Sequence, residues 1–300
     1  MMSILQEPVE FEGFRGVRLR GDAWGRAGAR SVLFLPGGGQ TRHAWGDTAA
    51  RVATHGWRAI ALDLRGHGES DWAPDGDYRI ETFVQDLHAV VRALPDPPVV
   101  VGASLGGVTA LLLAGEVDPQ AFSALVLVDI APRMEPDGVQ RIVDFMRRHL
   151  DGFASIEEAA DAVAAYLPHR PRPKDLSGLE KNLRRDSSGR YRWHWDPEFV
   201  LGTKRPDASR QPERLLAAAR KLAIPTLLIR GRMSDVISHE SVAEFLDAVP
   251  HADYVDVAGA GHMIAGDRND VFSEAVLAFL DGGLRKRGSH GHHRPSPAGR

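Results

Sequence analysis

Short apolar runs recur along the chain and are separated by segments with a helical hydrophobic period. The runs typical of strands are 31–36 (SVLFLP), 58–63 (RAIALD), 98–103 (PVVVGA), 124–129 (ALVLVD), 225–231 (PTLLIRG) and 252–257 (ADYVDV). Most of them are apolar at successive positions, as a strand covered on both faces requires. The pattern therefore predicts a parallel sheet.

Helical segments alternate with these strands. They are expected at 48–55, 80–94, 105–117, 239–249 and 269–280. A repeated strand–helix–strand order implies right-handed crossovers, so the fold class is α/β with a doubly wound, mostly parallel sheet. Residues 9–24 alternate between polar and apolar positions, which predicts an antiparallel hairpin at one edge.

The alternation breaks between residues 131 and 222. No strand-like run occurs there, and helical patterns at 139–150, 156–166 and 176–185 are separated by turns rich in proline and arginine. Because open α/β sheets bind ligands at their carboxyl edge, we expect residues 131–222 to form a helical cap, or lid, over that edge. The α/β core then comprises 1–130 and 223–282, and the basic tail 283–300 is expected to be disordered.

The amino-acid composition excludes several kinds of catalytic and binding chemistry. The 300 residues include no cysteine, which excludes disulfides, thiol nucleophiles and cysteine-ligated metals. The formal net charge of −3 conceals an acidic body, because residues 1–284 hold 32 basic against 40 acidic residues. Such a body does not favour nucleic acid. With no signal-peptide pattern and no run near the ~20 apolar residues that span a bilayer, we expect a cytoplasmic protein without a membrane segment.

The sequence Gly102-Ala103-Ser104-Leu105-Gly106 follows one predicted strand and precedes a predicted helix. A G-x-S-x-G pattern in this place allows a sharp turn that raises the serine hydroxyl above the sheet. The pattern alone is weak evidence, and its position between strand and helix gives it weight. Ser104 is therefore the candidate nucleophile, provided that a base lies nearby.

His262 is the candidate base, because it lies in a glycine-rich loop directly after the last predicted strand. An acid must orient its imidazole. Asp235, which follows the strand 225–231, gives the order nucleophile, acid, base that serves this geometry. Asp129, at the end of the strand before it, is the alternative acid.

Negative charge that develops on a substrate carbonyl oxygen needs donors already in place. The backbone N–H of Leu105, at a helix start, is one candidate. The other is expected from the loop Pro36-Gly37-Gly38-Gly39-Gln40, where Gly38 is our choice. A phosphate-binding role for this loop is excluded, because no Gly-Lys-Ser/Thr follows it.

Taken together, these blocks resemble the α/β-hydrolase family across nearly the whole chain. The matching segments are LPGGGQTRHAW, ALDLRGHGES, VVVGASLGG, LVLVDIAP, LLIRGRMSD and GAGHMIAGD, in family order. The resemblance implies Ser104 as nucleophile, Asp235 as acid, His262 as base, and Gly38 with Leu105 as the oxyanion hole. The chain departs from the family at Pro36, where a histidine that organises the loop is usual. Another block is expected to fix a turn beneath the site through Asp63, Arg65, His67 and Ser70.

The predicted function is a serine hydrolase that cleaves a small or medium hydrophobic ester through an acyl-enzyme. Trp45, Met134, Phe145, Met146, Val236 and Met263 are candidates for an apolar pocket, and Trp193 with Trp195 for seating the cap or lining that pocket. By resemblance, the same residues would also serve a carbon–carbon bond hydrolase, a lactonase or a cofactor-free perhydrolase, and a non-catalytic binding protein is a remote alternative. No cofactor or metal is implied, the partners expected are a hydrophobic small molecule and water, and the sequence does not determine the oligomeric state.

Overall fold

The computed structural model describes residues 5–168, 172–262 and 269–283. An eight-stranded sheet lies at the centre, in the order β1-β2-β4-β3-β5-β6-β9-β10. Its strands are β1 (Gln6–Glu12), β2 (Arg18–Trp24), β3 (Ser31–Leu35), β4 (Arg58–Leu62), β5 (Val99–Ala103), β6 (Ala124–Val128), β9 (Thr226–Gly231) and β10 (Asp253–Val257). The pairs β1/β2 and β2/β4 are antiparallel and all other pairs are parallel. The mostly parallel sheet and its edge hairpin are thus confirmed.

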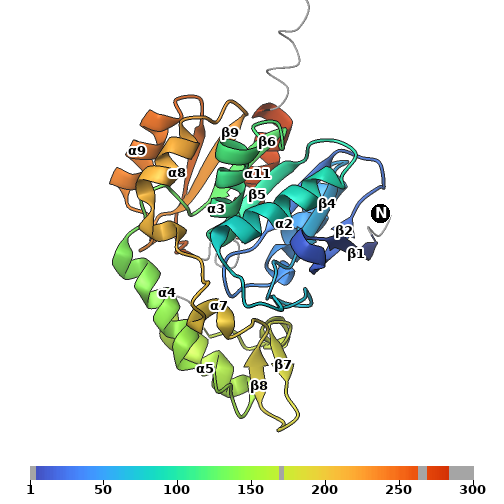
Figure 1. The fold of residues 1–300 in the computed structure, drawn as a ribbon, viewed down its shortest axis with the longest axis vertical. Coiled ribbons are helices and arrows are strands. Elements are labelled where there is room, and N and C mark those ends of the chain that lie inside the picture. Colours follow the sequence, from blue (N-terminus) through green and yellow to red (C-terminus); the bar gives the residue numbers. More distant parts are fainter. Residues whose placement is uncertain (1–4, 169–171, 263–268, 284–300) are drawn as a thin grey trace, which may run out of the picture.

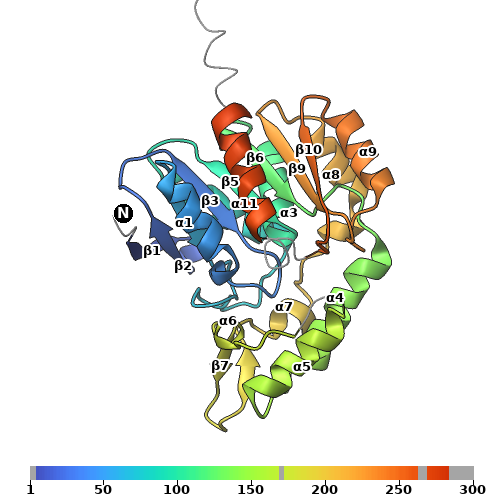
Figure 2. The same ribbon diagram turned by 180° about the vertical axis from the view of Figure 1, so that it is seen from behind.

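Helices cover both faces of this sheet. The helices α1 (Gly46–Thr54) and α11 (Asn269–Ala278) pack on one face, which Figure 2 shows in front. The opposite face, in front in Figure 1, carries α2 (Ile80–Arg92), α3 (Leu105–Leu112), α8 (Pro212–Ala219) and α9 (His239–Ala248). Alternate residues of one strand enter the two resulting cores: Phe34 joins the first, while Leu33 and Leu35 join the second. Covering on both faces explains why the strands are continuously apolar.

Membrane-spanning helices are absent from the described ranges, since none of their helices combines sufficient length with sufficient apolar character.

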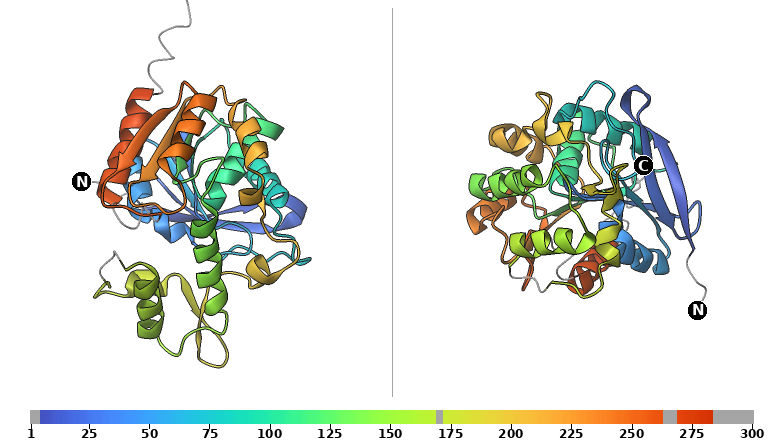
Figure 3. Two further views of the ribbon diagram at one scale, coloured as in Figure 1. Left: turned by 90° about the vertical axis from the view of Figure 1, so that its left-hand side faces the viewer. Right: turned by 90° about the horizontal axis from the view of Figure 1, so that it is seen from below.

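Between β6 and α8 the chain forms an inserted segment, residues 131–211, that lies beyond the carboxyl end of the sheet (Figures 1 and 3). It contains α4 (Pro136–Arg148), α5 (Ile156–Tyr166), α6 (Ser177–Glu180), α7 (Glu198–Leu201) and a hairpin of β7 (Leu183–Arg185) and β8 (Tyr191–Trp193). Two expectations are wrong here. The segment does contain strands, and the helix predicted over 176–185 ends at Glu180. The Asp186 carboxylate accepts the N–H groups of Ser188 and Arg190, and this turn favours the hairpin.

The cap predicted from the sequence extends to residue 222, and these bounds include α8. In the structure it packs against α3 and α9 on the face of the sheet, with Leu215 and Ala218 fully buried. A Cβ on Gly115 would lie 2.4 Å from the carbonyl oxygen of Ala218, so the two backbones are in close contact. Residues 212–219 therefore belong to the layer that covers the sheet.

The inserted segment is attached to the core through a short turn, residues 66–68. Gly68 N–H donates to the His194 carbonyl (2.7 Å), and Asp196 N–H donates to the Gly66 carbonyl (2.8 Å). Trp193 and Trp195 stack on each other with ring centroids 5.0 Å apart, and the backbone of Trp195 forms a bridge with His67. These contacts place the tryptophan pair between the insert and the core, and neither ring lines the cavity at Ser104.

Candidate active site

Ser104 occupies a strained turn between β5 and α3. Its φ of 44° and ψ of −113° are unusual for a residue with a side chain. The turn depends on two glycines, because a Cβ on Gly102 would lie 2.7 Å from the Gly106 carbonyl oxygen, and a Cβ on Gly106 would lie 2.6 Å from the Leu35 carbonyl oxygen. The sequence pattern around Ser104 thus forms the sharp strand-to-helix turn that it predicts.

His262 contacts Asp129 at the same edge of the sheet. Its Nδ1 lies 2.7 Å from Asp129 Oδ2. Asp129 follows β6, the neighbour of the strand that leads to Ser104, and Ser104 N–H donates to the Val128 carbonyl (3.3 Å). Asp129 also has a left-handed backbone, with φ of 48°. Because a carboxylate accepts, the imidazole donates its Nδ1–H to Asp129 and keeps Nε2 as an acceptor.

Asp129 is held by two further donors. Gly231 N–H donates to its Oδ1 (2.9 Å), and the Ser234 hydroxyl donates to its Oδ2 (2.5 Å). The carboxylate is 1% exposed. The sequence singled out neither donor, although both lie in the RGRMSD block that follows β9.

The expected partner of His262, Asp235, lies elsewhere. Its carboxylate is 49% exposed and pairs with Arg141 of α4, with Oδ2 3.0 Å from Nε. The turn closed by the hydrogen bond from Ser234 N–H to the Gly231 carbonyl (2.8 Å) carries the chain past the sheet edge before Asp235. The preferred pairing of Asp235 with His262 is therefore wrong, and the alternative acid Asp129 makes that contact.

The loop after β3 presents a free backbone N–H beside Ser104. Gly37 N–H donates to Gln40 Oε1 (3.0 Å), and Gly39 N–H donates to His67 Nε2 (2.9 Å). Within the described residues, the N–H groups of Gly38 and Leu105 have no hydrogen-bond partner. Gly38, Ser104 and Leu105 all line one cavity. Gln40 and His67 thus hold the loop that begins at Pro36, where the family usually has a histidine.

That cavity has a volume of about 540 Å³. Three of the predicted pocket residues, Met134, Met146 and Val236, line it. Its other apolar lining residues are Leu105, Val108, Val139, Ile142, Val143, Phe199 and Val200. Helix α4 thus supplies one apolar wall of the cavity that contains Ser104.

Two other predicted pocket residues do not line this cavity. Trp45 is 1% exposed and packs between Phe34 and Phe272 on the other face of the sheet. Phe145 stacks on Tyr166 inside the inserted segment, with ring centroids 4.4 Å apart. Met263, the remaining candidate, lies outside the described residues.

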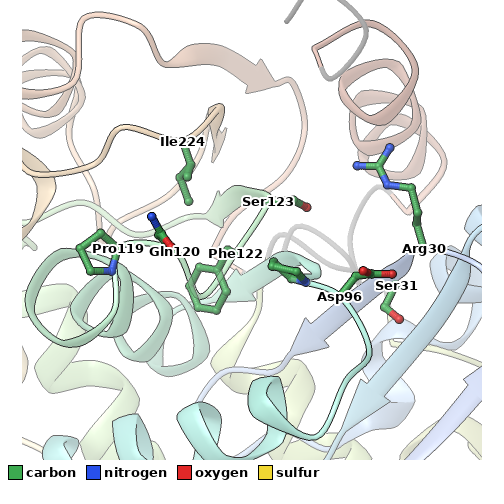
Figure 4. A pocket seen from close by; sticks show the side chains of 9 residues that line it. Arg30, Ser31, Asp96, Pro119, Gln120, Phe122, Ser123 and Ile224 are labelled. Atoms are coloured by element: carbon green, nitrogen blue, oxygen red, sulfur yellow. The ribbon is translucent and has the colours of Figure 1, made fainter. Parts of the chain in front are cut away.

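A second cavity of about 540 Å³ lies at the opposite edge of the sheet. Figure 4 shows its side chains, among them Arg30, Ser31, Asp96, Ser123 and Ile224, which lie at or just before the starts of β3, β5, β6 and β9. Ligands of parallel sheets bind at the carboxyl ends of the strands. Its two serines, Ser31 and Ser123, lie at these amino ends, whereas Ser104 lies in the strained turn at the carboxyl end of β5. The cavity at Ser104 is the better candidate site.

The turn beneath the site has the contacts expected of it. The Asp63 carboxylate accepts the N–H groups of Arg42 (2.7 Å) and Glu69 (3.0 Å), and the Ser70 hydroxyl donates to the Asp63 carbonyl (2.7 Å). Arg65 forms an ion pair with buried Asp86. These buried contacts position His67, which is 1% exposed.

The buried His67 ring is expected to make the stability of the protein depend on pH. Its Nδ1–H donates to the Arg65 carbonyl (2.9 Å) and its Nε2 accepts from Gly39, so the ring is neutral. Burial lowers its pKa. Since the unfolded state binds a proton below pH ~6.5 and the folded state does not, the free energy of unfolding falls as pH drops below that value. We expect His67→Gln to remove up to about 1.4 kcal/mol per pH unit from this slope.

The slope is measured by urea unfolding of both proteins between pH 7 and about pH 5. His43 and His149, whose pKa values burial also lowers, contribute equally to both proteins and cancel in the comparison. Parallel slopes would contradict a neutral His67, because a ring that is protonated in the folded state adds no such dependence.

Comparisons with known proteins identify the family to which the chain is similar. A family model described as the alpha/beta hydrolase fold matches residues 30–268. The chain is 32% identical to esterase Rv0045c of Mycobacterium tuberculosis over 265 aligned residues. This alignment covers 86% of this chain and 85% of that protein. The chain is 26% identical over 231 residues to the 3-hydroxybutyrate-oligomer hydrolase of Cupriavidus necator, with coverages of 72% and 77%.

A crystal structure of the Mycobacterium tuberculosis esterase Rv0045c superposes with a TM-score of 0.72 at 30% identity, over 93% of this chain and 92% of that chain. The fold, the strand-to-helix turn at Ser104 and the family model all point to one assignment. Since the model spans most of the chain and an esterase relative is 32% identical along 86% of it, the chain belongs to the α/β-hydrolase family.

Proposed function

We propose that this protein is a serine hydrolase that cleaves a small or medium hydrophobic ester. In this proposal Ser104 is the nucleophile, His262 the general base and Asp129 the acid that orients it. The observation that carries the proposal is the 2.7 Å contact between His262 Nδ1 and Asp129 Oδ2, at the sheet edge where Ser104 stands in its strained turn.

The proton movements follow from this contact. With Nδ1–H donated to Asp129, His262 takes the Ser104 hydroxyl proton on Nε2 as the oxygen attacks the ester carbonyl. Asp129 stabilises the imidazolium that results. His262 then gives the proton to the departing alcohol, which leaves an acyl-Ser104 ester, and activates a water molecule that hydrolyses it.

The unpartnered N–H groups of Gly38 and Leu105 supply the oxyanion hole in this mechanism. Leu105 is the first residue of α3, so its N–H also lies at the positive end of the helix dipole. Anchoring Gly37 and Gly39 through Gln40 and His67 leaves Gly38 as the residue of this loop whose N–H can serve the substrate. Donors fixed in advance avoid reorganisation during the reaction.

The relatives support ester cleavage, because the Mycobacterium tuberculosis protein is an esterase and the Cupriavidus necator protein is a 3-hydroxybutyrate-oligomer hydrolase. The apolar wall of α4 over Ser104 supports an apolar acyl chain.

A fluorophosphonate probe tests the proposal, because it modifies an activated serine covalently. We expect a single adduct on Ser104 in a peptide mass map, and none in the Ser104→Ala variant. The labelled protein should lose hydrolysis of p-nitrophenyl esters. An unlabelled Ser104 would contradict the proposal and favour a non-catalytic binding protein. Turnover of a lactone, a β-diketone or hydrogen peroxide with a carboxylic acid, in place of esters, would assign the same residues to the alternative reactions.

A further inference from the structure

Three arginines line the cavity that contains Ser104. Arg147 comes from α4, whereas Arg205 and Arg210 come from the segment between α7 and α8. Arg147 and Arg210 are exposed and Arg205 is half-buried, so the three lie at the rim, while the interior near Ser104 is apolar. The cavity is thus apolar at the serine and positive at its mouth.

The guanidinium groups at this rim are unpaired. Within the described ranges, Arg147, Arg205 and Arg210 make no side-chain hydrogen bond or ion pair. Two other arginines of the inserted segment have side-chain partners, since Arg172 pairs with Asp161 and Arg184 lies over the Trp72 ring.

The charge at the rim is opposite to that of the body. Three arginines there face one acidic lining residue, Asp207, in a chain whose formal net charge is −3. A local positive cluster in a concave site raises the concentration of anions and steers them into it. Arginine binds carboxylates and phosphates through paired hydrogen bonds.

We propose that the substrate of Ser104 is amphipathic and carries an anionic group, a carboxylate or a phosphate, that Arg147, Arg205 and Arg210 bind at the rim. The apolar part of the substrate fills the cavity between this group and the scissile ester. The proposal rests on the proposed hydrolase function and specifies its substrate class.

Two matched substrate pairs test it and separate the two sources of charge. The first pair is p-nitrophenyl hydrogen adipate and p-nitrophenyl hexanoate, which have acyl chains of equal length that end in a carboxylate or a methyl group. The second pair is hexanoyl-coenzyme A and the hexanoyl thioester of N-acetylcysteamine, which differ in the phosphates of the leaving group. We expect the wild type to favour the anionic member of at least one pair by roughly tenfold in kcat/KM, mainly through KM.

The triple variant Arg147→Gln, Arg205→Gln and Arg210→Gln should bring that ratio close to one. The matched control is the triple variant Arg148→Gln, Arg220→Gln and Lys221→Gln, because these three residues are exposed and lie outside the cavity lining, and their substitution removes the same number of positive charges. It should keep the wild-type ratio. Asp207→Asn should raise the ratio. High salt should lower it, since charges at an exposed rim are screened.

The outcomes distinguish this inference from the proposed function. Equal Ser104-dependent hydrolysis of both members of both pairs, or a preference that survives in the triple variant, would overturn the anion site and leave the hydrolase intact. A second readout needs no turnover: calorimetry with the Ser104→Ala variant should show tighter binding of monomethyl adipate than of methyl hexanoate. If the three arginine substitutions abolish this difference in affinity, the anion site at the rim is supported, whichever bond the enzyme cleaves in its natural substrate.

Discussion

In a Ser104→Ala variant, kcat for a p-nitrophenyl ester is expected to fall by roughly 10⁴ to 10⁶. The hydroxyl is the atom that forms the acyl-enzyme, and no cysteine anywhere in the chain can replace it. The Gly38 and Leu105 N–H groups remain in the variant and leave a small residual rate above that of the buffer. The measurement is steady-state hydrolysis at saturating ester, corrected for spontaneous release of p-nitrophenol.

The variant Ser104→Gly separates the effect of losing the nucleophilic hydroxyl from the effect of the strained backbone at residue 104. Glycine adopts a φ of 44° without a steric penalty, so this variant should lose as much activity as Ser104→Ala but gain about 1 kcal/mol in free energy of unfolding. Wild-type turnover in either variant would require another nucleophile and would refute the mechanism. A loss of activity accompanied by loss of the folded circular-dichroism signal would be a folding effect, so both variants are measured by unfolding first.

The strands of the sheet could be predicted from the sequence because they are buried on both faces. Each parallel strand is flanked by helices on two sides, which leaves an unbroken apolar run such as 124–128. The helix α5 begins and ends at the predicted residues, since its Ser155 cap accepts Glu158 N–H and defines the start.

The strands of the inserted segment could not be predicted from the sequence, because they are short and depend on tertiary contacts. Its strands β7 and β8 have three residues each, too few to show a period. Their pairing depends on the Asp186–Gly189 turn and on backbone contacts with residues far away in the chain, such as Phe153 with Tyr191. Tertiary contacts of this kind have no local sequence signal.

At the candidate site, the sequence located the serine and the histidine because each has a local signature, a turn between strand and helix or a glycine-rich loop. The acid has none, since Asp129 and Asp235 each follow a strand at the same sheet edge. Which of the two contacts His262 depends on the path of the chain after the turn at Gly231–Ser234, which carries Asp235 away from the sheet edge. The contact of His67 with Gly39 was missed as well, because it joins two loops that are 28 residues apart.

Asp129→Asn is expected to lower kcat by roughly 10⁴, whereas Asp235→Asn should leave it within about twofold of the wild type. In the asparagine variant, the amide oxygen is needed by Gly231 N–H, so the amide nitrogen takes the place of Oδ2 beside His262 Nδ1. Two donors then face each other unless the imidazole moves its proton to Nε2. That tautomer cannot accept the Ser104 proton.

Asp235→Asn makes the same change of charge and shape in an exposed ion pair with Arg141, which contributes little to stability. It is therefore the matched control for Asp129→Asn. Both variants are compared with the wild type in kcat across pH 5–9, because a base that has lost its orientation should depress the rate at every pH. If Asp235→Asn were the more damaging of the two, the loop after β9 would have to rearrange to bring Asp235 to His262 in the working enzyme, and Asp129 would not be the acid.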